Sequence, residues 1–375
     1  MITKIEIKNI KSIDNASIDF QKAKYQYLTE MIFNEKNVNP IAVYGKNGSG
    51  KSSLLVAICS VANLLTAEKE QLSPLVPNNI ILYNDYVKNN KKEFNSFSEQ
   101  TKSCIKIKFL LGEFDYEYFI ETSFECITKE YLKISNKLIF SRSKTLLKYN
   151  HNEIQIEKTF YSSLRKLANE IDVNSHIESA FNFLSNISFV DPANKIYMCK
   201  GYLNKNAYDV LVDKSSEVKG ILKKYSDFPL YNIVSQVDPI LGQKQYFYSY
   251  EFNSKIFLPI SSLSNGMFKN SLLLSTVLSM PKNGVLIVDE LENALHPVAI
   301  LDFLNIIKEK NIQLIFSSHN TFILQHLRPD QIFFAYWKHG FSKYSKLSDI
   351  YPNIRQVNNI EKMYLSNLFD EEIEK

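Results

Sequence analysis

The alternation of apolar and polar residues at the start of the chain predicts strands. "KIEIKNI" alternates in this way, which is typical of a half-buried strand over Ile5–Ile10. "NASIDF" repeats the alternation after a turn at residues 12–15, and we expect both strands at the antiparallel edge of a sheet. "PIAVY", at Pro40–Tyr44, is continuously apolar, which indicates a buried parallel strand.

Helical and strand patterns then follow in turn. A helix is expected from Lys51, because five apolar residues recur at helical spacing: Leu54, Leu55, Ile58, Val61 and Leu65. The polar residues 78–100 predict a loop. "CIKIKFLLGEFDYEYFIE" predicts a hairpin that turns at Gly112, and strand character continues to residue 157.

From about Lys158 to Pro239 the periodicity becomes helical, in "SSLRKLANEI", "IESAFNFLSNI" and "SSEVKGILKKYSDF". After "YFYSYEF" the mixed pattern returns. "GVLIVDE" and "IQLIFSS" predict buried strands, and "PVAILDFLNIIKEK" and "TFILQHL" predict helices. The sequence therefore predicts an α/β fold, with a mixed sheet, flanking helices and an inserted helical lobe. The expected parts are 1–157 and 246–345 for the two halves of the α/β domain, 158–245 for the lobe, and 346–375 for a C-terminal tail.

Composition narrows the class of protein only a little. The net charge of +4 over 375 residues does not by itself indicate a nucleic-acid partner, although "KNNKK" at Lys88–Lys92 is a candidate basic face. No signal peptide or membrane span is evident, so we expect a cytoplasmic protein with no membrane partner. The cysteines lack zinc-ligand spacing and are expected to be reduced thiols: Cys59, Cys104, Cys126 and Cys199.

"GKNGSGKS" fits the phosphate-binding P-loop pattern G-x-x-x-x-G-K-[ST]. Its glycines let backbone N–H groups turn toward a phosphate at the start of the following helix. Lys51 is expected to contact the β- and γ-phosphates, and Ser52 to bind Mg²⁺. The residues expected to bind the nucleotide here are Gly45, Asn47, Gly48, Ser49, Gly50, Lys51, Ser52 and Ser53.

Two acidic residues end the buried strand "GVLIVDE". Asp289 is expected to hold the Mg²⁺ shell, and Glu290 to act as the base that polarises a water for attack on the γ-phosphate. His319 follows the next strand, at the edge where open α/β folds bind their ligands. We expect it to hydrogen-bond the γ-phosphate or the attacking water, whereas a lone histidine is otherwise more often structural.

Ser264, Asn265 and Gly266 are expected to open a helix. A hydroxyl and free N–H groups at a helix start make a second anion site. An ordinary N-cap is the simpler interpretation of this motif alone. One nucleotide does not need two γ-phosphate sites in one chain, but two facing chains would each complete the other's P-loop.

The order of these motifs resembles that of ABC-type ATPase heads, in the branch that includes RecF, the structural-maintenance-of-chromosomes proteins and the OLD-type ATPases. "IEIKNIKSI" and the asparagine form of the P-loop resemble that branch. "FLLGEFDYEYFIE", "KEYLKISNKLIFSR", "DELENALHP" and "LRPDQIFFAYWK" resemble the RloA-like ATP/GTP phosphatases, bacterial AAA-family ATP-binding proteins. The resemblance covers nearly the whole chain.

That resemblance implies ATP and Mg²⁺ as ligands, and a homodimer or higher homo-oligomer. It gives Lys51, Glu290 and His319 catalytic roles, and places Ser264 and Gly266 in trans. Lys11 and Ser12 are also implied to touch the nucleotide, and His296-Pro297 to lie at the dimer interface. The metal-sensing glutamine of the family would be Gln71 or Gln100.

Two functions follow from the resemblance. The first is the ATPase sensor or regulatory subunit of a bacterial anti-phage defence system, which controls a separate effector, a nuclease or toxin. The chain shows no nuclease signature of its own, and the residues after His319 are too few for a Toprim domain. The alternative is a RecF-like DNA-binding repair ATPase, for which DNA would be a partner. An ABC transporter subunit is disfavoured, because transporter signatures are tighter.

Overall fold

The computed structural model of the chain describes residues 1–33, 36–66, 102–123, 126–170, 174–191, 196–198, 207–225, 231–239, 242, 244–250, 255–293, 295–356, 358–366 and 368–369. The expected loop at 78–100, the basic run at Lys88–Lys92, both candidate glutamines and Cys199 lie outside these residues.

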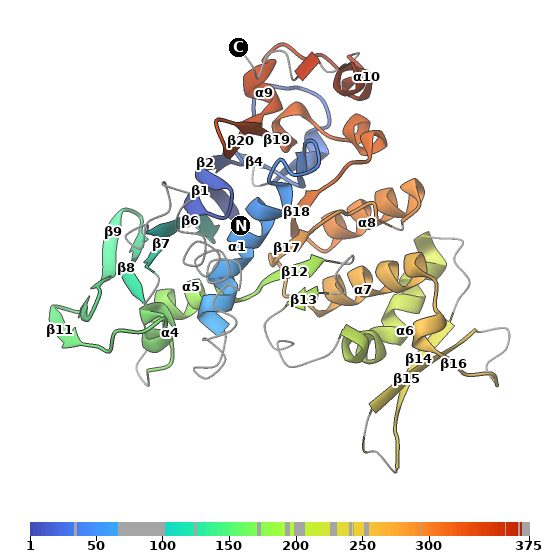
Figure 1. The fold of residues 1–375 in the computed structure, drawn as a ribbon, viewed down its shortest axis with the longest axis horizontal. Coiled ribbons are helices and arrows are strands. Elements are labelled where there is room, and N and C mark those ends of the chain that lie inside the picture. Colours follow the sequence, from blue (N-terminus) through green and yellow to red (C-terminus); the bar gives the residue numbers. More distant parts are fainter. Residues whose placement is uncertain are drawn as a thin grey trace.

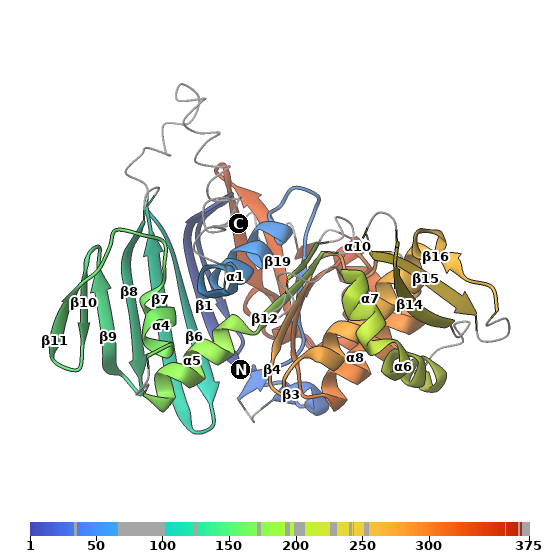
Figure 2. The ribbon, with the colours of Figure 1, turned by 90° about the horizontal axis from the view of Figure 1, so that it is seen from below.

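An eight-stranded antiparallel sheet forms the left side of Figure 2. It confirms the strand expected at Ile5–Ile10, which extends back to Ile2, and the hairpin that turns at Gly112. In order across the sheet the strands are β11 (Asn152–Gln155), β10 (Leu146–Tyr149), β9 (Lys137–Ser143), β8 (Ile127–Ile134), β7 (Phe114–Thr122), β6 (Ser103–Leu111), β1 (Ile2–Ile10) and β2 (Ile13–Asp19).

A second, seven-stranded sheet runs through the centre of the molecule. Its five inner strands are parallel and its two outer strands pair antiparallel, as expected for a mixed sheet. In order the strands are β13 (Ile196–Met198), β12 (Ile187–Asp191), β17 (Val285–Val288), β18 (Gln313–Ser317), β5 (Ile41–Tyr44), β19 (Ile332–Lys338) and β20 (Phe341–Lys346).

Helices cover both faces of the central sheet. On β5, Ile41 and Val43 join one core and Ala42 and Tyr44 join the other, because successive strand side chains point to opposite faces. Helix α1 lies between the two large sheets in Figure 2, and α7 and α8 pack on the opposite core. Within the described residues the α-helices are α1 (Lys51–Thr66), α4 (Ser163–Ala168), α5 (Ser175–Ser185), α6 (Ala207–Tyr225), α7 (Asn265–Ser279), α8 (Pro297–Glu309), α9 (Leu347–Ile350) and α10 (Ile360–Leu365).

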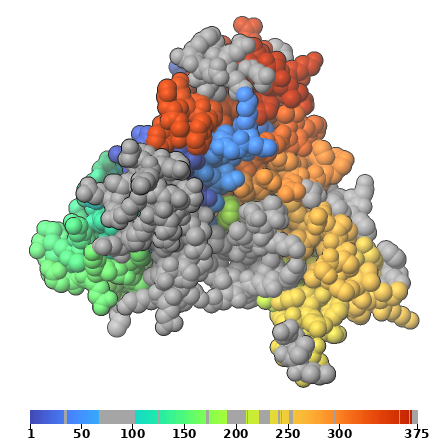
Figure 3. Space-filling view, viewed as in Figure 1, coloured from blue at the N-terminus to red at the C-terminus, as the bar shows by residue number. Residues whose placement is uncertain are grey.

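Short elements complete the fold. Strands β14 (Tyr231–Val237), β15 (Lys244–Tyr250) and β16 (Leu258–Pro259) form a small sheet that projects at the lower right of Figure 3, and β3 (Ile32–Phe33) pairs with β4 (Asn37–Val38). "TFILQHL", predicted as a helix, is the 3-10 helix η4 (Thr321–His326). The other short helices are η1 (Thr29–Met31), η3 (Ile260–Ser262) and η5 (Pro329–Gln331).

The segment 158–245 differs from a purely helical lobe. It holds α4, α5 and α6, but β12 lies between them and pairs in parallel with β17 inside the central sheet. The apolar residues of α4 and α5 join the core around α1, whereas Leu211 and Val218 of α6 join the core around α7. The helical pattern of this segment is real, but tertiary packing divides its helices between two sides of the sheet.

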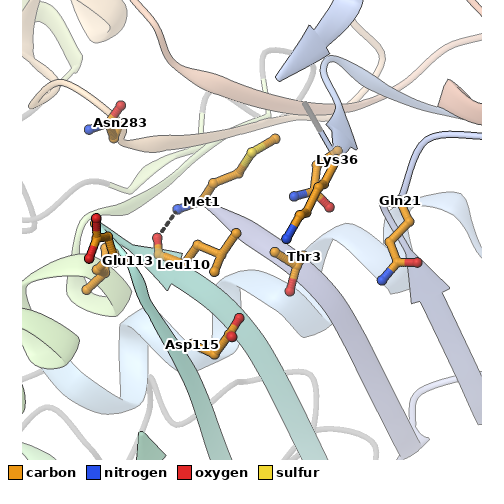
Figure 4. Close-up of a pocket in the computed structure, with 11 residues that line it drawn as sticks. Met1, Thr3, Gln21, Lys36, Leu110, Glu113, Asp115 and Asn283 are labelled. Atoms are coloured by element: carbon orange, nitrogen blue, oxygen red, sulfur yellow. Dashed lines mark hydrogen bonds between the residues drawn. The ribbon is translucent and has the colours of Figure 1, made fainter. Parts of the chain in front are cut away.

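No helix in the described part of the chain is long and apolar enough to cross a membrane. A pocket of about 680 Å³ opens beside the start of β1 and the turn between β6 and β7 (Figure 4). The Met1 ammonium group donates a hydrogen bond of 2.8 Å to the carbonyl of Leu110 at this pocket. None of the predicted site residues lines it, so it is distinct from the P-loop.

Candidate functional site

The P-loop joins β5 to α1, as the sequence predicts, and close packing requires glycine at Gly45 and Gly50. A Cβ atom on Gly45 would lie 2.1 Å from the carbonyl oxygen of Ala335 on β19. A Cβ on Gly50 would lie 2.1 Å from the Ser342 hydroxyl on β20, and the φ of Gly50 is +104°. The C-terminal hairpin β19–β20 therefore supports the loop from behind.

Lys51 folds back across this loop. Its Nζ donates to the carbonyls of Gly45 and Lys46, at 3.0 and 3.1 Å. Burial lowers the pKa of Lys51, and the carboxylates of Asp289, Glu292 and Glu290 oppose that shift in this order. Three acidic side chains after β17 therefore lie within electrostatic reach of the P-loop lysine.

Ser49 is a P-loop residue whose side chain is available to a polar ligand. Its hydroxyl is buried, with 4% of the residue exposed, and has no hydrogen-bond partner in the structure. An unpartnered buried hydroxyl costs about 1–3 kcal/mol. A phosphate oxygen is an acceptor that such a donor fits, and the neighbouring Lys46, Asn47, Gly48 and Ser52 are exposed.

Ser317 organises the two acidic residues that follow β17. Its hydroxyl donates to Asp289 Oδ1 at 2.5 Å and accepts from the backbone N–H of Glu290 at 2.7 Å. Because β17 and β18 are parallel neighbours, their carboxyl ends meet at one edge of the sheet. This role is not evident in the sequence, although "LIFSSHN" places the serine at a strand end.

Glu292 is a second site residue that sequence analysis missed. Its Oε1 accepts a hydrogen bond of 2.6 Å from the backbone N–H of His319, and its Oε2 is buried with no partner. The carboxylate thereby joins the loop after β17 to the loop after β18. The His319 side chain is exposed beside it, and Tyr44, on β5, donates to the carbonyl of Asn320 at 2.9 Å.

Lys11 and Ser12 differ in how they meet the site. Burial lowers the pKa of Lys11, opposed by the nearby Asp289, so the Lys11 ammonium group lies within electrostatic reach of the site. The Ser12 hydroxyl lies 2.7 Å from the Ser342 hydroxyl and 3.2 Å from that of Ser53, which places it behind the loop. A contact of either residue with a nucleotide stays a prediction.

Ser264 caps α7, as the sequence predicts. Its hydroxyl accepts from the backbone N–H of Met267 at 3.3 Å. Ser264 and Asn265 are exposed, and Gly266 is partly exposed. His296 likewise caps α8, where its Nδ1 accepts from the N–H of Val298 at 3.4 Å. Both helix starts are on the surface.

Comparison with known proteins identifies the family of the chain. A family model described as "AAA domain, putative AbiEii toxin, Type IV TA system" matches residues 41–325, from β5 into η4. The match spans well over half of the chain, and the chain belongs to this family of AAA domains. It is therefore placed among the ATPases of the AAA class, in agreement with the P-loop and the acidic strand end.

Solved structures with similar folds include heads of SMC proteins. One, an SMC head bound to the C-terminal winged-helix domain of ScpA, has a TM-score of 0.49 and 14% identity, over 93% of this chain and 99% of that chain. The SMC head domain from Thermotoga maritima has a TM-score of 0.44 and 13% identity, over 92% and 98%. An SMC head with an extended coiled coil, from Pyrococcus furiosus, has a TM-score of 0.48 and 14% identity, over 100% of this chain and 99% of that chain. No curated protein matches the sequence.

Proposed function

We propose that this protein binds ATP with Mg²⁺ and hydrolyses it between two copies of the chain. The observation that carries the proposal is the position of Lys51. It lies in a P-loop with an unpartnered buried hydroxyl at Ser49, and within reach of Asp289, Glu290 and Glu292. A P-loop lysine with three carboxylates in electrostatic reach suits a site that handles both a triphosphate and a metal ion.

Each residue of the site has its own role in this reaction. The P-loop amides and Lys51 bind the phosphates, and Glu290 takes the proton of the attacking water. His319 donates to the γ-phosphate oxygen. Ser52 and Asp289 would hold Mg²⁺, which prefers oxygen ligands and keeps few protein ligands beside phosphate. When bound, Mg²⁺ neutralises charge on the phosphate oxygens.

Dimerisation is supported by the surface position of the α7 start. Ser264 and Asn265 are exposed, and the N–H groups of a helix start attract an anion. In a homodimer or higher homo-oligomer, these residues of one chain would bind the γ-phosphate held by the other. The two chains would close on each other when ATP binds, and they would separate after hydrolysis.

The biological role that we propose is a cytoplasmic sensor or regulatory subunit of an anti-phage defence system. The family description names a putative toxin and a toxin–antitoxin system, which supports a role in such a system. A separate effector, a nuclease or toxin, is the form of that role that we propose. DNA is then a candidate trigger. In the alternative function, a RecF-like repair ATPase, the protein would instead bind DNA as the molecule on which it acts.

Two experiments test the proposal. The Glu290→Gln variant should bind ATP, lose turnover and accumulate as a dimer only with ATP, measured by light scattering after gel filtration. If this variant hydrolyses ATP at the wild-type rate, Glu290 is not the base. If it stays monomeric at saturating ATP, the ATP-dependent dimer is excluded. Turnover with and without duplex DNA separates the two roles, since strong stimulation that falls steeply with salt would favour repair.

A further inference from the structure

Glu290 holds a backbone conformation that L-residues rarely adopt. Its φ is +48°, in the left-handed region, although it is not glycine. Such a residue costs on the order of 1–3 kcal/mol and persists only where the surroundings determine it. The residue that we propose as the base is therefore held in place at an energetic cost.

Three contacts hold the Glu290 backbone. Its N–H donates to the Ser317 hydroxyl at 2.7 Å, and its carbonyl accepts from the N–H of Asn293 at 2.9 Å. The third contact comes from another element: Nζ of Lys269 donates to the same carbonyl at 2.6 Å. The first two contacts belong to the loops at the sheet edge, whereas Lys269 belongs to α7.

Lysine is an unusual residue at a position as buried as that of Lys269. It is only 2% exposed, and burying an ammonium group is expensive unless it is hydrogen-bonded. It follows Met267, whose N–H closes the Ser264 cap, by two positions. The exposed start of α7 and the amine that touches Glu290 therefore lie on one short, hydrogen-bonded piece of helix.

We propose that Lys269 is a positioning residue, which fixes the strained backbone of Glu290 and ties it to the start of α7. The inference rests on the proposed ATPase function. Because the cap and the amine share one helix, a shift of that helix on meeting the other chain's nucleotide changes the distance from Nζ to the Glu290 carbonyl. Glu290 then takes its catalytic position when the start of α7 contacts the nucleotide of the other chain.

A purely structural lysine would also stabilise the fold, so the test must separate the two roles. In Lys269→Met the stem is kept and the donor is lost. We expect kcat for ATP to fall about tenfold or more while KM changes by less than about twofold, and Lys269→Arg to restore part of kcat. Lys346→Met is the matched control, because this lysine is also buried and donates to a backbone carbonyl, that of Gln21, at 2.8 Å.

The decisive measurement is a double-mutant cycle with Glu290→Gln. If Lys269 acts through Glu290, Lys269→Met should leave the residual rate of Glu290→Gln unchanged. Equal losses in both backgrounds, or a wild-type kcat for Lys269→Met alone, would overturn the inference while the ATPase function stands. If the wild-type protein does not hydrolyse ATP, both the inference and the proposed ATPase function are wrong. If Lys269→Met does not fold, Lys269→Gln, too short to reach the carbonyl, carries the same test.

Discussion

The hydroxyl of Tyr344, on β20, donates a hydrogen bond of 2.7 Å to the carbonyl of Gly50 in the P-loop. Ser342, on the same strand, lies against Gly50 and bonds Ser12. A phosphate loop near the start of the chain is thus shaped by a hairpin near its end. Contacts with β19 and β20, and not its own glycines alone, therefore shape the loop.

Gly50→Ala should damage this support. The new methyl group would meet the Ser342 hydroxyl at 2.1 Å, on backbone with a φ of +104°. We expect ATP affinity, measured by titration calorimetry, to fall at least about tenfold because the loop must shift. Gly112→Ala is the control: its φ is also positive, but nothing lies within 4 Å of its Cβ, so it should cost about 1 kcal/mol of stability. Unchanged ATP affinity in Gly50→Ala would contradict the expectation.

Ser317→Ala should impair catalysis more than binding. It removes one hydroxyl that holds both the Asp289 carboxylate and the Glu290 N–H. Losing a group that orients a metal ligand costs about 10–100-fold in activity. We expect steady-state assays to show that loss in kcat. Ser279→Ala, whose hydroxyl bonds only its own helix at Ser275, should keep the wild-type rate; equal rates for the two variants would exclude the role.

Glu292→Gln should change the pH dependence of ATP binding. The Glu292 carboxylate raises the pKa of Lys51, against burial, which lowers it. Removing that negative charge lowers the Lys51 pKa further, so Lys51 loses its proton at a lower pH. The alkaline loss of ATP affinity should therefore begin at lower pH than in the wild type. Affinity profiles that superimpose from neutral to alkaline pH would refute this.

Arg328→Met should destabilise the fold strongly. Arg328 is 0% exposed and its guanidinium binds Asp330 through Nε and Nη2, both at 2.9 Å. The variant leaves a buried carboxylate without its cation, which costs about 3–5 kcal/mol. Chemical denaturation should show this loss. Lys148→Met, which breaks the exposed pair with Glu153, should cost about 0–1 kcal/mol. A similar loss in both variants would be inconsistent with the buried pair.

Local patterns predicted much of the fold. The apolar run at Ile41–Tyr44, the glycine pattern after it and the helix from Lys51 are each written in consecutive residues, and the structure confirms them. The hairpin at Gly112 and the cap at Ser264 are equally local. Backbone sterics and period-based burial act within a few residues, so the sequence alone is enough to read them.

The tertiary structure decided the rest. The placement of β12 inside the central sheet, the hairpin behind the P-loop, and the contacts of Ser317, Glu292 and Lys269 join segments far apart in the chain. No neighbouring residue signals such a contact, because its free energy comes from packing and burial that exist only once distant strands and helices have met. The sequence by itself determined that there is a phosphate loop and an acidic strand end. Only the folded chain brought the carboxylates to the lysine and fixed the backbone of Glu290.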